Sequence, residues 1–121
     1  MTTLKPGIIV HLDELHASSP FAATPSQSLR VLGQLNSYDV ETGIALITEA
    51  GASLKVDTQL LHDVALRQGS LYQFIGELNF TASNEMVLQA RVGRNVDGLD
   101  LKLYDKALQL RRQFEKEHVH A

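Results

Sequence analysis

Aromatic rings and cations on the outer faces of strands are the side chains in this sequence that could do chemistry. Proteins hold single-stranded nucleic acid by stacking bases on exposed rings beside a cationic groove. Alternation with apolar neighbours turns several cations outward, and one tyrosine stands at the exit of a long predicted strand. The candidate nucleic-acid-binding residues are Arg30, Tyr38, Lys55 and Arg91. The alternative is that these charges only solvate the wall of a β-sheet.

Patterns for catalysis or metal binding give a weaker signal. The chain has no cysteine, nucleophile elbow, phosphate-binding glycine loop or HExxH motif. Metal ligands must converge on one face, and hydrolytic carboxylates must point inward from strands around a metal. The available pairs have the wrong spacing or fall in predicted turns and caps: His11/His16, His118/His120, Asp13/Glu14 and Asp97/Asp100. We therefore expect no enzyme, no metal and no other cofactor.

The balance of charge limits how this protein could hold nucleic acid. Its 11 basic residues face 14 acidic ones, which gives a formal net charge of −3. Because affinity depends on neutralising phosphates, an autonomous binder normally carries a basic surplus. The sequence therefore favours a weak contributor to a larger assembly. No apolar segment reaches the ~18 residues of a membrane span, and we expect one soluble domain without a signal peptide.

Alternation of apolar and polar residues dominates most of the chain and predicts strands. Gly43 supplies the turn of a hairpin, and Gly33 inside the longest strand predicts a bend or a bulge. Thr58 is the expected N-cap of a helix that ends near Arg67. A short strand is predicted at 8–12, and the five main strands are predicted at 29–39, 44–49, 53–57, 70–78 and 86–92.

From Asp100 onward the apolar spacing becomes helical, and Asp100 is the expected N-cap of a helix over about 100–117. This helix carries two apolar stripes. One stripe suffices to dock the helix on its own domain and consists of Leu101, Tyr104 and Leu108. The other needs a different partner, since exposed apolar patches usually mark binding sites, and it consists of Leu103, Ala107, Leu110 and Phe114.

Together these elements predict an all-β fold with accessory helices. Five strands, a helix between the third and fourth, and a C-terminal helix describe an OB-fold, a five-stranded Greek-key barrel. An immunoglobulin-type sandwich would have seven strands and no terminal helix. Residues 1–121 are expected to form this single domain. Tyr72 and Phe74 share one strand face and belong in its core, and the last strand is expected to turn Met86, Leu88, Ala90 and Val92 inward.

Five short motifs in one collinear order resemble the small subunit of the CST telomere-capping complex, the Ten-one family. They cover nearly the whole chain. The motifs are Lys5-Pro6-Gly7; Leu12 to Leu15; Ser28 to Leu35 with Tyr38-Asp39; Gly69 to Tyr72 with Gly76 to Leu78; and Gln89 to Val92 with Val96 to Leu101.

The resemblance implies a non-enzymatic protein of the nucleus, chromosome and telomere. Such a subunit pairs with the Stn OB-fold subunit through C-terminal helices and joins the large CST subunit. The trimer binds single-stranded telomeric DNA, protects chromosome ends and assists the polymerase alpha–primase fill-in. By position, partner contacts would fall on Leu99, Leu103, Leu110 and Phe114. Leu99 also has a local explanation, as a hydrophobic staple with Tyr104 around the helix cap.

Three other functions remain open from sequence. The nearest is a small subunit of replication protein A, with the same fold and pairing mode but a role in general DNA replication. An autonomous single-strand binder is disfavoured by the negative charge. An OB-fold hydrolase lacks the inward carboxylate cluster that it would need.

Overall fold

Six strands, a short 3-10 helix and one α-helix make up the part of the chain that the computed structural model describes, residues 8–15, 28–61, 64–83 and 85–119. No helix among these residues is long and apolar enough to cross a membrane. In chain order the elements are β1 (Ile8–Ile9), η1 (Leu12–Glu14), β2 (Ser28–Asp39), β3 (Ile44–Glu49), β4 (Ala52–Asp57), β5 (Leu71–Phe80), β6 (Met86–Asn95) and α1 (Leu101–Val119).

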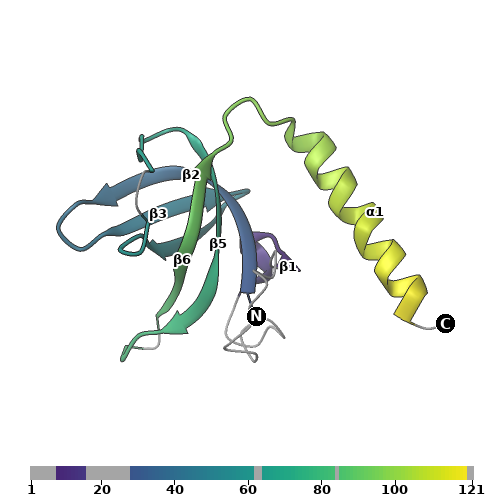
Figure 1. The fold of residues 1–121 in the computed structure, drawn as a ribbon, viewed down its shortest axis with the longest axis horizontal. Coiled ribbons are helices and arrows are strands. Elements are labelled where there is room, and N and C mark those ends of the chain that lie inside the picture. Colours follow the sequence, from purple (N-terminus) through teal and green to yellow (C-terminus); the bar gives the residue numbers. More distant parts are fainter. Residues whose placement is uncertain (1–7, 16–27, 62–63, 84, 120–121) are drawn as a thin grey trace, which may run out of the picture.

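The sheet closes on itself because β2 pairs with two different strands (Figure 1). Its first half, 28–34, runs antiparallel to β5, and its second half, 34–39, runs antiparallel to β3. The order of neighbours is β1-β2-β3-β4-β6-β5, with the β2–β5 pairing closing a barrel of β2 to β6. This confirms the predicted five-stranded OB-fold barrel with its C-terminal helix.

The core fills the inside of this barrel with the inward side chains of every strand. Leu29, Val31, Ile47 and Leu88 have no accessible surface or almost none. Tyr72 and Phe74 are also fully buried, and their rings stack with centroids 5.9 Å apart. Both are therefore core residues, as the shared strand face predicted.

The predicted helix from Thr58 to Arg67 is wrong for the residues that the structure describes in this segment, 58–61 and 64–67. Thr58 does not cap a helix, because its hydroxyl donates to the Gly43 carbonyl at 2.6 Å. Farther along, the Tyr72 hydroxyl donates to the Ala65 carbonyl and accepts from the Arg67 N–H, both at 2.7 Å. These contacts to other parts of the chain take backbone groups that a helix would need.

Three smaller expectations also need correction. The first strand ends at Ile9, because η1 turns the chain where the sequence predicted strand as far as residue 12. In β2 the irregularity lies between Leu35 and Ser37 rather than at Gly33. In β6 the ladder skips Arg91, and this bulge reverses the alternation, so that Val92 is exposed instead of buried.

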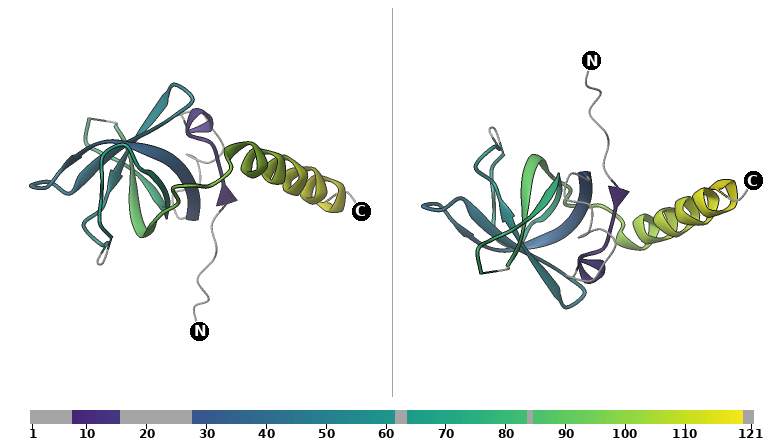
Figure 2. Two further views of the ribbon diagram at one scale, coloured as in Figure 1. Left: turned by 90° about the horizontal axis from the view of Figure 1, so that it is seen from above. Right: turned by 90° about the horizontal axis from the view of Figure 1, so that it is seen from below.

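Helix α1 stands out from the barrel, and β1 and η1 lie on the side of the barrel that faces the helix (Figure 1; Figure 2). The hairpin of β2 and β3 points away from it on the opposite side of the molecule (Figure 1). The barrel thus has one end that carries a projecting helix and another that carries an extended hairpin. This arrangement leaves most of the helix surface outside the core.

Replacing Gly76 by alanine is expected to destabilise the barrel strongly. An added Cβ would lie 2.0 Å from the backbone carbonyl oxygen of Gln89, so β5 and β6 would have to separate. At Gly33 the same methyl would approach only the Ile47 side chain, at 2.9 Å. We expect a loss of about 3 kcal/mol for Gly76→Ala and about 1 kcal/mol for Gly33→Ala, measured by urea unfolding. Equal losses would contradict the close approach of the two strands.

Candidate partner and nucleic-acid interfaces

Helix α1 begins where the sequence predicted, at the cap formed by Asp100. The Oδ1 atom of Asp100 accepts hydrogen bonds from the backbone N–H groups of Lys102 and Leu103, both at 3.1 Å. These bonds satisfy donors that a helix N-terminus would otherwise leave unpaired. The helix therefore starts at a defined residue. The position of this start, together with the helical period, determines which side chains face the barrel.

One side of α1 faces the barrel and η1. Leu108 is buried there, with 5% of its surface exposed. Arg112 extends from the same side and binds both carboxylate oxygens of Glu14, at 2.9 and 3.0 Å, and the Ile9 carbonyl at 2.9 Å. The predicted docking stripe is thus confirmed at Leu108. Tyr104 of the same stripe is partly buried. The prediction is wrong at Leu101, which is half exposed and lines a cavity between the helix and the barrel.

The opposite side of α1 presents large apolar side chains to solvent. The exposed fractions are 64% for Leu103, 57% for Leu110 and 59% for Phe114. Ala107 lies between them and is exposed, and Leu99, just before the helix, is 39% exposed. The steps of four, three and four residues from Leu103 to Phe114 follow one helix face. We call the face formed by Leu103, Ala107, Leu110 and Phe114 the apolar face of α1.

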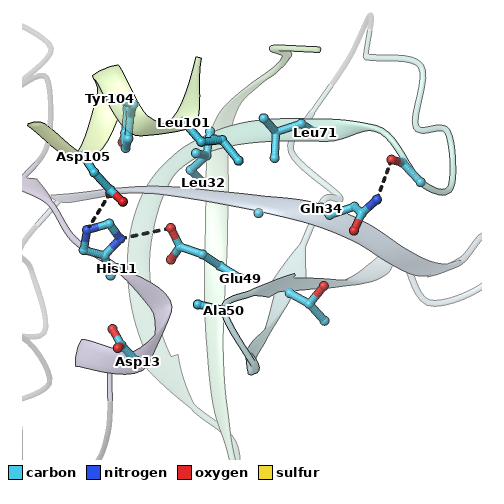
Figure 3. A pocket seen from close by; sticks show the side chains of 13 residues that line it. His11, Asp13, Leu32, Gln34, Glu49, Ala50, Leu71, Leu101, Tyr104 and Asp105 are labelled. Carbon is cyan, nitrogen blue, oxygen red and sulfur yellow. Dashed lines mark hydrogen bonds and ion pairs between the residues drawn. The ribbon is translucent and has the colours of Figure 1, made fainter. Parts of the chain in front are cut away.

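His11 connects this helix to the barrel at the edge of the cavity (Figure 3). Its Nδ1 lies 3.0 Å from Glu49 of β3, and its Nε2 lies 3.2 Å from Asp105 of α1. Burial disfavours the charged ring, but the hydrogen bond and charge of Glu49 and the charges of Asp105 and Glu14 outweigh it and raise the pKa of His11. No local pattern in the sequence signals this contact, because Glu49 and Asp105 lie far from His11 along the chain.

Tyr38 and Lys55, two of the predicted nucleic-acid-binding residues, line one shallow groove. The groove also includes Thr42 of the β2–β3 turn and Leu46 of β3. Tyr38 is 39% exposed, so its ring is accessible there. The Lys55 ammonium binds both carboxylate oxygens of Glu85 at 2.9 Å, and Glu85 lies in the connection between β5 and β6.

The other two candidates, Arg30 and Arg91, lie elsewhere on the barrel. Arg91 is paired with Glu77 at 3.0 Å and donates to the Ser28 hydroxyl at 3.1 Å. Arg30 lines a second hollow on β2, β5 and β6, together with Gln73, Ile75, Val92 and Arg94. The structure therefore does not bring the four candidates into one site. Among the described residues, no group of three or more side chains is arranged to hold a metal ion.

The fold and these surfaces define a class: an OB-fold protein that projects a terminal helix with an exposed apolar face. A sequence profile described as telomere-capping, CST complex subunit matches residues 3–118. The chain is 51% identical over 115 residues to the CST complex subunit TEN1 of Arabidopsis thaliana, covering 94% of this chain and 90% of that protein. It is 31% identical to the human CST complex subunit TEN1 over 94 residues, 74% of this chain and 76% of that protein.

Solved structures share the same architecture. A chain in the crystal structure of the S. pombe Stn1–Ten1 complex superposes with a TM-score of 0.71 at 17% identity, covering 92% of this chain and 96% of that one. The S. pombe telomere-capping protein Ten1 gives 0.69 at 18% identity, covering 87% and 96%. The present chain belongs to the Ten1 family of telomere-capping CST complex subunits, as the sequence resemblance predicted.

The two sides of α1 should differ in their effect on stability. Leu108→Ala removes a buried side chain and is expected to lower the free energy of unfolding by about 2 kcal/mol or more. Leu110 lies half a turn away around the helix and is exposed. Leu110→Ala should therefore change the free energy of unfolding by less than about 0.5 kcal/mol. Urea unfolding of the two variants beside the wild type measures both. A large loss for Leu110→Ala would mean that the apolar face is part of the core.

Proposed function

We propose that this protein pairs with an OB-fold partner of the Stn type through the apolar face of α1 and so takes part in telomere capping. The observation that carries the proposal is the exposure of Leu103, Leu110 and Phe114 along one helix face. Large exposed apolar patches mark interaction surfaces, since their burial by a partner is favourable. Family membership supports the choice of partner, as does the likeness to a chain from an Stn1–Ten1 complex.

The chemistry of the apolar face fits a partner helix. Ala107 lies between the larger side chains, so a second helix can approach closely at this point. Charged residues flank the face, and one pair, Arg111 and Glu115, is already joined at 3.1 Å within the helix. An apolar centre with a charged rim is the usual anatomy of a protein interface. Leu99 is exposed just before the helix, and we include it in the proposed interface as its end nearest the barrel.

For DNA, we propose an accessory role inside the assembled CST complex. OB-folds bind oligonucleotides across the second and third barrel strands and the adjacent loops, which here are β3 and β4. The groove of Tyr38 and Lys55 borders these strands. Its lysine is neutralised by Glu85, and the net charge is −3, which supports weak binding by this subunit alone. Arg30 and Arg91 lie outside this groove and would contribute from elsewhere on the barrel.

The wider role follows from the same proposal. A non-enzymatic subunit that joins the Stn-type partner and the large CST subunit would act in the nucleus, at chromosome ends. There the assembly would hold single-stranded telomeric DNA, limit its degradation and assist the polymerase alpha–primase fill-in. The alternative of a general replication subunit loses its support, because the matching family is the telomere-capping one.

The pairing proposal predicts that Leu110→Asp combined with Phe114→Ala abolishes co-purification with an Stn-type partner. Central interface anchors commonly cost ~2 kcal/mol or more each when truncated, and a carboxylate in an apolar contact adds a desolvation penalty. Gln109→Ala changes an exposed residue on another side of the same helix and should pair normally. Circular dichroism of each isolated variant checks that the barrel is folded. Normal pairing by a folded double variant would place the partner elsewhere.

The DNA proposal predicts that the isolated chain binds a labelled telomeric oligonucleotide with a micromolar or weaker Kd at ~100 mM salt. In the assembled complex, Lys55→Ala should reduce the slope of log affinity against log salt by about one, the value for one phosphate contact. Arg91→Ala should reduce the slope in the same way only if the Arg91 guanidinium leaves Glu77 to contact a phosphate.

Glu85→Gln provides the matched control for Lys55. It releases the ammonium from its ion pair without removing it, so binding should tighten rather than weaken. Nanomolar binding by the isolated chain would overturn the accessory role. An unchanged slope in both variants would make Lys55 a solvated residue of the barrel wall.

A further inference from the structure

A cavity lies between the start of α1 and the barrel, so apolar packing is incomplete at this point (Figure 3). The cavity has a volume of about 640 Å³ and is lined by Leu32 and Leu71 of the barrel and by Leu101 and Tyr104 of the helix. Side chains on opposite walls of such a hollow lose the close contacts that would hold two elements in one orientation. The direction of α1 therefore depends in part on the polar contacts beside the cavity.

His11 makes one of these contacts in a way that only its charged form can satisfy. Each ring nitrogen faces a carboxylate, with Glu49 of the barrel at 3.0 Å and Asp105 of the helix at 3.2 Å. A neutral imidazole has one N–H donor and one acceptor nitrogen, so it can donate to only one of them. The imidazolium donates to Glu49 and, through its positive charge, forms an ion pair with Asp105 as well. The geometry is therefore that of a charged ring joining β3 to α1.

We propose that His11 is a positioning residue for the partner-binding helix. As an imidazolium it holds α1 at a defined angle to the barrel, and so it sets the direction in which the apolar face is presented. When the ring is neutral, the link to Asp105 or to Glu49 is lost, and α1 keeps the contacts of Arg112 and Leu108. The helix then takes a wider range of directions. The consequence for pairing rests on the proposed function, whereas the consequence for the helix concerns this chain alone.

The charges around His11 determine the direction of its pH dependence. The groups near the ring are Glu49 from β3, Asp13 and Glu14 from η1, and Asp105 and Arg112 from α1. Arg112 is itself bound to Glu14, so carboxylates dominate the surroundings. The pKa of His11 is accordingly raised above 6.5. Because the folded pKa exceeds the unfolded one, the link is fully formed below pH 6.5 and is lost as the pH rises through the folded value.

The direction of the helix can be measured in the isolated chain. The sequence contains no cysteine, so spin labels can be placed at Glu41→Cys on the β2–β3 hairpin and Gln109→Cys on α1. Pulsed electron–electron double resonance then gives the distribution of distances between the two spin labels, and so between hairpin and helix, from pH 5.5 to 8.5. We expect a narrow distribution at low pH that broadens with a midpoint above ~6.5, the value for free histidine.

Two variants break the link from opposite ends. His11→Gln and Asp105→Asn should each give the broad distribution at every pH, whereas His62→Gln, which removes another histidine of the sequence, should titrate like the wild type. Asp105 is half exposed, so its variant keeps the test valid if His11→Gln does not fold. A distribution that stays narrow at all pH values in folded Asp105→Asn would overturn the proposal. NMR of the His11 ring checks that its own titration matches the midpoint.

The pairing consequence is tested separately with the Stn-type partner. Affinity should fall between pH 6 and pH 8 for the wild type, by up to about tenfold for each unit by which the pKa of His11 is raised. It should not fall in Asp105→Asn. If the partner fails to bind at any pH while the distance distributions behave as described, the proposed function is wrong and the positioning role of His11 stands. If the partner binds with no difference between the variants, His11 does not position the interface.

Discussion

The pairing of β2 with both β5 and β3 is the constraint on which the rest of the structure depends. One twelve-residue strand closes the barrel by changing neighbours at Gln34, so its first half must stay in register with β5 and its second half with β3. Beside the bulge in β6, the strands β5 and β6 come so close at Gly76 that no side chain fits there. Because every barrel strand pairs with two neighbours, the core is complete without the terminal helix.

A complete core explains why α1 stands outside the barrel. The stacked rings of Tyr72 and Phe74 and their neighbours fill the interior. Only one side of the helix is therefore covered, fully at Leu108 and partly at Tyr104. The remaining attachment is polar, through Arg112 and His11. Polar contacts between two elements define an orientation without burying much surface. The apolar face therefore stays available, which is the condition that a subunit built to pair with another protein must meet.

Two cations on the barrel surface are paired with carboxylates of the same chain. Lys55 is paired with Glu85 and Arg91 with Glu77, so cations that could attract phosphates are partly neutralised within the chain. Such exposed pairs contribute little to stability, commonly less than about 1 kcal/mol each. Their larger effect is on the field that a nucleic acid would meet. Together with a net charge of −3, this arrangement supports the accessory role in DNA binding that we propose.

The sequence by itself determined the elements whose signals are local. Alternation located the barrel strands, helical spacing located α1, and Asp100 marked its start, because each depends on residues only a few positions apart. Local patterns failed where distant groups compete for the backbone: Thr58 donates to Gly43 instead of capping a helix, and a bulge in β6 exposes Val92. The bridge from His11 to α1 and the separation of the four predicted DNA contacts were decided only by the tertiary structure. Barrel closure brings together or moves apart residues whose relation no spacing along the chain encodes.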